Sequence, residues 1–177
     1  MFWAQHISPV EIQENFGTLD YVWFVDEDLD LDSFCLERFI DVAAMLDVGL
    51  AQPGISAPCP SCRGSDYEAL EQRSVSNTSV VARITGFVEI MAPLIKMDVW
   101  RKVHETIEMF IGVHKLFSIT NWCPDFWWCG LAQQMVKQNA SSFKTPCAVV
   151  FATPIIHFDS KTMVKDEEFY ESSFFFS

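Results

Sequence analysis

Five carboxylates follow directly after an apolar run near the start of the chain. The segment YVWFVDEDLDLD, residues 21–32, reads as a buried strand that ends in Asp26, Glu27, Asp28, Asp30 and Asp32. Like charges this close repel one another, so either a solvated turn or a bound cation must offset the repulsion. Paired carboxylates at a strand end supply the oxygen ligands that Mg²⁺ and Mn²⁺ prefer. We therefore expect Asp26 and Asp28 to bind a divalent cation.

Two other interpretations of the acidic run stay open. Counting from Asp26, four aspartates and Glu37 occupy the ligand positions of an EF-hand calcium loop, but Leu31 stands where the sharp turn needs Gly. The segment before the run also favours a strand, where an EF-hand has a helix. Alternatively, the run is an acidic turn in which Asp30 and Asp32 lie at the positive N-terminus of the next helix.

Composition limits the classes of protein that the chain can belong to. Half of its 177 residues are hydrophobic and 14% are aromatic, which predicts one folded domain over residues 1–177 with a sizeable core. The formal net charge of −12 disfavours binding to a nucleic-acid backbone but is compatible with a cation. The sequence contains no run of about 18 apolar residues, so no membrane span is predicted. The first residues do not resemble a signal peptide. We expect a cytoplasmic protein, or a secretory-pathway (Golgi) protein if the chain is a piece of a longer one.

Helical and strand patterns alternate along the chain. Ser8 and Pro9 predict the start of a short N-terminal helix within residues 1–16. Further helices are predicted near residues 33–47, 99–112 and from about residue 125, and further strands at 50–56, 79–96 and 147–158. Residues 56–78 are predicted to form a long loop and residues 166–177 a peripheral tail. This order predicts an α/β fold with a mainly parallel, mixed sheet flanked by helices.

The six cysteines give a weak signal. Cys59 and Cys62 form the one C-x-x-C motif, in a Pro- and Ser-rich stretch without the second ligand pair of a zinc knuckle. We interpret them as thiols of a loop, with a local disulfide or metal clip as the alternative. Cys35 and Cys147 lie in apolar surroundings and are predicted to be core residues.

Several motifs resemble a known group of enzymes. The segment YVWFVDED resembles the D-x-D element of GT-A glycosyltransferases, which use nucleotide sugars. The segments LAQPGIS, GFVEIMAPLIKMDVWRKV and CPDFWWCGLA follow in the order found in an uncharacterised, plant-rich glycosyltransferase-like family of unknown function. The resemblance covers roughly residues 19–160. It implies a GT-A-like fold and transfer of a sugar from a nucleotide-sugar donor to a carbohydrate or other hydroxyl acceptor.

The resemblance also implies roles for individual residues. Asp26 and Asp28 would hold Mn²⁺ or Mg²⁺ against the nucleotide diphosphate, and His157, in PIIHFD, would complete the metal site. Asp125, in CPDFWW, is a candidate catalytic base, and Glu89, in GFVEIMAP, matches a carboxylate near the acceptor. Structural alternatives stay open for these residues: a helix N-cap for Asp125, a buried core histidine for His157, and a partnered buried acid for Glu89.

Other residues of these motifs have less specific interpretations. Trp127 and Trp128 are candidates for stacking on a sugar or for the core. His104 and His114 lie on or near a predicted helix and are expected to be surface or packing residues. Only 25 residues precede Asp26, whereas a GT-A domain has a nucleotide-binding strand and helix before D-x-D. The second interpretation is therefore a non-catalytic α/β remnant that serves as a binding or structural module.

Overall fold

The computed structural model describes residues 7–56, 80–113 and 124–157. Along these ranges the elements are α1 (Pro9–Phe16), β1 (Tyr21–Trp23), β2 (Leu29–Asp30), α2 (Leu36–Met45), β3 (Val48–Ser56), β4 (Ala82–Ile84), β5 (Leu94–Lys96), α3 (Met97–Val113), α4 (Pro124–Lys137) and β6 (Thr145–His157). The predicted loop at 56–78 and the tail at 166–177 lie outside the described residues except for Ser56, and so do Cys59, Cys62 and His114.

Local signals in the sequence account for α1. The Ser8 side chain accepts a hydrogen bond from the Val10 backbone N–H at 3.2 Å, and Pro9 occupies the first turn. Gly17 ends the helix with a φ of 76°, a backbone conformation that residues with a Cβ atom rarely adopt. The predicted N-terminal helix is confirmed over residues 9–16.

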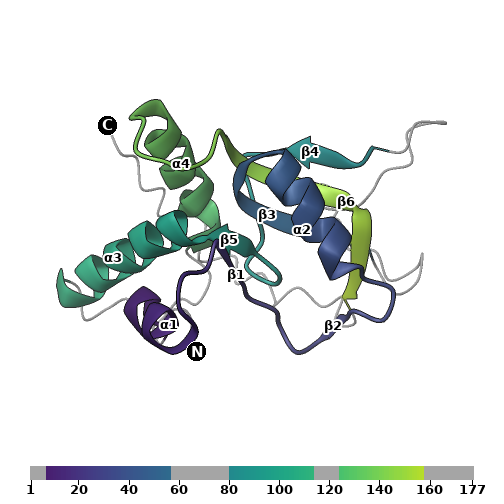
Figure 1. The fold of residues 1–177 in the computed structure, drawn as a ribbon, viewed down its shortest axis with the longest axis horizontal. Coiled ribbons are helices and arrows are strands. Elements are labelled where there is room, and N and C mark those ends of the chain that lie inside the picture. The colour runs from purple at the N-terminus through teal and green to yellow at the C-terminus, as the bar shows by residue number, and fades with distance from the viewer. Residues whose placement is uncertain (1–6, 57–79, 114–123, 158–177) are drawn as a thin grey trace, which may run out of the picture.

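The strands form one mixed sheet in the order β1-β5-β3-β6-β2, and β4 pairs with β6 outside this path, at Ala148 to Val150 (Figure 1). The α/β class is confirmed, but the prediction of a mainly parallel sheet is wrong. Only β3 and β6 pair in parallel, whereas the other four pairings are antiparallel. Parallel neighbours need a crossover, usually through a helix, and no helix is described between β3 and β5. Apolar runs show that a strand is buried but not which way its neighbour runs.

Helices cover both faces of the sheet. On one face, α2 packs Phe39, Val42 and Ala43 onto Val48 and other strand residues. On the other face, α3 and α4 bury a larger cluster that includes Trp100 and Trp128, and α1 adds Ile12 (Figure 1). Burial of these apolar side chains is the main stabilising contribution.

A bulge interrupts β6 shortly before its end. While β3 advances two positions from Pro53 to Ile55, β6 advances five positions from Val150 to Ile155. Bulges bend a strand and re-aim the side chains that follow. Beyond the bulge, β6 also pairs with β2, so His157 lies opposite Leu29.

Two predictions for cysteines need correction. Cys147 is fully buried as predicted, but it forms a disulfide with Cys129 of α4. Cys35 was predicted to be in the core and is exposed, because it lies just before α2, where the chain turns into the helix. The apolar neighbours of Cys35 gave no indication of which side of the helix start would face solvent.

Candidate functional site

Asp26 lies at the end of an extended segment that runs beyond β1. The Phe24 N–H donates to Pro93 O at 3.1 Å and the Asp26 N–H donates to Met91 O at 2.9 Å. These bonds continue the β1–β5 pairing past Trp23. The predicted strand at 21–25 is shorter and less buried than expected, since β1 ends at Trp23 and its three residues are half-buried.

Asp28 and His157 meet although 129 positions separate them in the sequence. The antiparallel pairing of Leu29 with His157 sets this contact, because Asp28 is the next residue along the chain. His157 Nε2 and Asp28 Oδ2 are 3.0 Å apart. The His157 side chain is buried, with 10% exposed, whereas 38% of the Asp28 side chain is exposed. The pair thus reaches solvent through the carboxylate.

The segment that carries Glu89 is held by hydrogen bonds from three parts of the fold. Fully buried Gln52 of β3 accepts from the Glu89 backbone N–H through its Oε1 atom. Trp128 Nε1 of α4 donates to Val88 O at 2.9 Å. Trp23 Nε1 of β1 donates to Ala92 O at 3.1 Å. These three hydrogen bonds fix residues 88–92, which form neither a helix nor a strand.

Burial and mutual repulsion perturb two carboxyl groups of the site. Burial is the larger effect that raises the pKa of Asp26 from its ordinary value of 3.8 to about 6, and the Asp28 and Glu27 charges add to it. Burial also raises the pKa of Glu89, with a further contribution from Asp26. His157 acts in the opposite direction on both groups. Asp26, Asp28, Glu89 and His157 therefore share one electrostatic environment.

One oxygen of Glu89 is buried without compensation. Its Oε1 atom is inaccessible to solvent and has no hydrogen-bond partner among the described residues. A buried polar atom in this condition costs free energy unless a ligand or water satisfies it. Glu89 therefore offers an acceptor that the described part of the fold does not use.

The donor set suits a hard cation in chemistry and charge. Carboxylate oxygens match the preferences of Mn²⁺ and Mg²⁺, and a cation would offset the burial and the like charges that raise the pKa of Asp26. Across residues 7–56, 80–113 and 124–157, however, no three acidic, histidine or cysteine side chains already lie in a metal-holding arrangement. Of the three predicted ligands, the structure brings Asp28 and His157 into contact and places Asp26 close enough that both of them change its pKa.

The rest of the acidic run behaves as a turn. Asp30 Oδ1 accepts from the Asp32 N–H at 2.8 Å, within the run itself. The acidic-turn alternative holds for the turn itself, but Asp30 and Asp32 do not cap the next helix, since α2 begins at Leu36 after Cys35, whose side chain makes no capping hydrogen bond. The EF-hand alternative is also wrong, because β2 lies inside the supposed loop and pairs with β6.

Asp125 is the second residue of α4, which begins at Pro124, so it lies inside the first turn and not at the N-cap. Its side chain lies outside the part that the structure describes, and its role stays a prediction. Trp128 is 1% exposed and belongs to the core, which removes it as a sugar-stacking surface. Trp127 is half-buried and packs on the same cluster.

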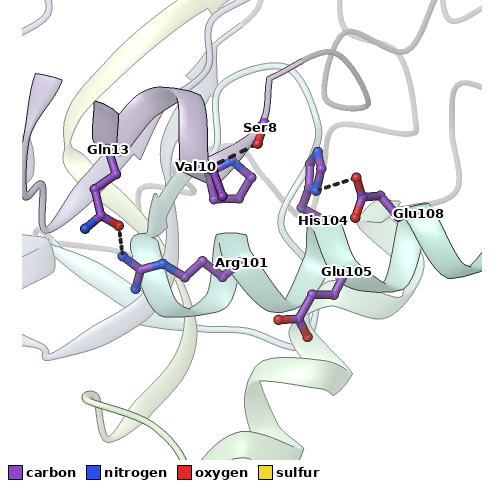
Figure 2. A pocket seen from close by; sticks show the side chains of 8 residues that line it. Ser8, Val10, Gln13, Arg101, His104, Glu105 and Glu108 are labelled. Carbon is purple, nitrogen blue, oxygen red and sulfur yellow. Dashed lines mark hydrogen bonds and ion pairs between the residues drawn. The ribbon is translucent and has the colours of Figure 1, made fainter. Parts of the chain in front are cut away.

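A second group of polar residues lies between α1 and α3, around a cavity of about 250 Å³ (Figure 2). His104 is buried there, against the edge of the Trp100 ring, as the packing interpretation predicted. His104 Nδ1 lies 3.7 Å from Glu108 Oε1, one helical turn away. Arg101 donates to Gln13 Oε1 at 3.3 Å. None of the four residues of the acidic site lines this cavity.

Gln52 is the residue of the site that sequence reasoning missed. It carries an amide inside LAQPGIS, an otherwise apolar strand segment. A polar side chain at such a position needs an internal partner, and that requirement was the available signal. The partner, the Glu89 backbone, lies 37 positions away.

Comparison with known proteins gives one match. A family described as "Protein of unknown function (DUF707)" matches residues 13–168, which is most of the chain. No curated protein and no solved structure matches significantly. The expected family of unknown function is thus confirmed, while the glycosyltransferase character stays a prediction. In the described ranges, no helix is both long and apolar enough to cross a membrane.

Proposed function

We propose that this chain, which belongs to the DUF707 family, is a metal-dependent glycosyltransferase that transfers a sugar from a nucleotide-sugar donor to a hydroxyl acceptor. The observation that carries the proposal is the meeting of Asp28 and His157 at 3.0 Å beside Asp26 and Glu89. These four residues come from three segments that are far apart in the sequence. Such convergence of titratable groups, among them Asp26 and Glu89 with raised pKa values, is typical of functional sites.

The carboxyl ends of three strands support the same assignment. Because β5 is antiparallel to both β1 and β3, and β3 is parallel to β6, the strands β1, β3 and β6 run in one direction. Asp26 follows the end of β1 and His157 is the last residue of β6. Ligands of α/β sheets gather at carboxyl ends of strands.

Asp26, Asp28 and His157 would hold Mn²⁺ or Mg²⁺. When bound, such a cation acts as a Lewis acid that stabilises charge on a diphosphate leaving group. The three residues supply the negative charge and the imidazole that select a divalent cation over a monovalent one. Asp28, being the more exposed partner of its pair, faces the side from which a donor would approach.

Glu89 is the candidate for proton transfer. A general base works best when its pKa is near the working pH, and burial raises the pKa of this carboxyl. Its Oε1 atom has no hydrogen-bond partner among the described residues, and this role requires a movement that opens the buried carboxyl group to an acceptor hydroxyl. Asp125 stays the second candidate for this role.

A non-catalytic role is the competing proposal. It is favoured by the direct contact of His157 Nε2 with Asp28 Oδ2, which pairs these two atoms without a cation, and by the absence of a preformed three-ligand cluster in the described residues. In that case the site would serve only to join β2 to the end of β6.

The thermal midpoint of unfolding separates the two proposals. Mn²⁺ with a nucleoside diphosphate should raise the midpoint of the parent protein, and Asp28→Asn should abolish the rise. Asp41→Asn, an exposed substitution on α2, is the matched control and should keep it. An unchanged midpoint in the parent protein, together with no metal-dependent hydrolysis in a screen of nucleotide sugars, would overturn the enzymatic proposal.

A further inference from the structure

The disulfide between α4 and β6 indicates where the chain folds. Cys129 is 4% exposed and Cys147 is fully buried, so the bond is part of the core and not an incidental surface contact. Disulfides form and persist in oxidising compartments and are rare where glutathione keeps thiols reduced. Each bond requires that two thiols lose two protons and two electrons, here to a disulfide-bearing oxidant by thiol–disulfide exchange.

The loop closed by this disulfide contains an acceptor triplet for N-glycosylation. Asn139-Ala140-Ser141 has the form Asn-x-Ser with a residue other than Pro in the middle. Asn139 follows the end of α4, where its N–H donates to Val136 O at 3.1 Å and its φ is 53°. A residue in this conformation ends the helix in a tight turn.

The turn has room for a large polar modification. Asn139 and Ala140 are both exposed, and no hydrogen bond or ion pair of the Asn139 side chain is present among the described residues. Ser141 Oγ donates to Phe143 O at 2.9 Å, so the hydroxyl that the transferase must recognise is engaged in the folded turn. Modification would therefore precede the folding of this turn.

The site lies away from the acidic residues along the sheet. Asn139 precedes the first residue of β6, whereas His157 is the last residue of that 13-residue strand. A glycan on the turn therefore leaves the strand ends that carry Asp26 and His157 accessible.

From these observations we infer that Asn139 is N-glycosylated and that the chain folds in the lumen of the secretory pathway, with Cys129 and Cys147 oxidised. In the transfer, the Asn139 amide nitrogen forms a bond to the anomeric carbon of the oligosaccharide. The diphosphate-linked lipid carrier leaves from that carbon, and the amide loses one proton. The inference does not depend on the proposed glycosyltransferase activity.

Peptide mapping tests this inference on the protein expressed from its full coding sequence in eukaryotic cells. Free thiols are blocked in denaturant without reductant, so that the buried cysteines are accessible to the reagent, and N-glycans are then released in ¹⁸O-water. We expect the peptides with Cys129 and Cys147 to be linked and unblocked, and Asn139 to be recovered as ¹⁸O-labelled Asp. Recovery of blocked thiols at these cysteines, or of unmodified Asn139, would overturn the inference.

Substitutions identify the modified residue. A second triplet, Asn77-Thr78-Ser79, lies outside the described residues, so the comparison is made in an Asn77→Gln background. Asn139→Gln and Ser141→Ala should each remove the glycosidase-sensitive mobility shift, whereas Ser141→Thr should keep it. Asn15→Gln is the matched control, because Phe16-Gly17 follows Asn15 and forms no triplet. A shift that persists in Asn139→Gln would exclude Asn139.

Discussion

Among the described residues, a histidine and a carboxylate come together in two regions, and the two pairs differ in origin. His104 and Glu108 are four residues apart on α3, at 3.7 Å, and 69% of the Glu108 side chain is exposed. His157 and Asp28 are 129 positions apart in the sequence, at 3.0 Å, and meet through the pairing of β2 with β6. The first pair follows from helix geometry alone, whereas the second exists only because the sheet forms.

The neighbours of the two pairs differ as well. Around His157, burial and like charge raise the pKa of Asp26 and of Glu89, and a buried amide, that of Gln52, supports the segment that carries Glu89. Around His104, the other carboxylate, Glu105, pairs with Lys102 at 2.9 Å on the exposed face of α3. Carboxyl groups are thus buried close to like charges in the acidic site, whereas beside α3 they are exposed or paired with a cation. This difference favours the acidic site as the functional one.

Loss of the hydrogen bond between Gln52 and the Glu89 backbone should give the largest change in stability. Gln52→Leu leaves the Glu89 N–H without its acceptor, and we expect the free energy of unfolding to fall by about 1–3 kcal/mol. Chemical denaturation measures the change. Gln133→Leu, on the exposed face of α4, should stay within about 0.5 kcal/mol of the parent. Equal effects of the two substitutions would show that the Gln52 contact does not support the site.

The raised pKa of Asp26 should make the free energy of unfolding depend on pH. Because its pKa is raised from 3.8 to about 6, the folded state binds more protons than the unfolded state between these values. Stability contributed by this group therefore falls as the pH rises through that window. Asp26→Asn should raise the free energy of unfolding at pH 7 and leave it nearly unchanged at about pH 3.

Denaturation at several pH values tests this prediction, with Asp41→Asn as the control that should show no such gain. If Asp26→Asn were less stable than the parent protein at pH 7, the Asp26 carboxylate would be stabilising, and the description of a repulsive acidic site would be wrong.

The pair on α3 should give the smallest effect. Glu108→Gln removes an exposed partner one turn from His104, and such pairs contribute about 0.2–0.5 kcal/mol. We expect a change of that size in denaturation at low salt and a smaller one at high salt. A loss above about 1 kcal/mol, insensitive to salt, would mean that the two regions differ less than their geometry indicates.

The sequence predicted local features of the fold well. The cap of α1, the helix that contains Phe39 and the face of α3 around Trp100 follow from residues within one or two turns of each other. The direction of β5 and the short, half-buried β1 did not follow, because an apolar run fits either strand direction and either degree of burial.

The candidate site was predictable in part. Asp26 and Asp28 stood out because the acids crowd within one turn, and Glu89 and His157 came only from the resemblance to glycosyltransferases. The support by Gln52 and the disulfide between Cys129 and Cys147 were missed, because both join elements whose relative placement no local pattern specifies.

The sequence by itself determined where helices begin, where charge accumulates and that the chain has a large apolar core, since these depend on neighbouring residues. Only the tertiary structure decided that Asp28 touches His157, that Gln52 holds the Glu89 backbone and that Cys129 pairs with Cys147. Each of these contacts requires two distant segments to be aligned by strand pairing and by helix packing on the sheet. The free energy that fixes this alignment comes from burial over the whole core, not from the contacting residues themselves.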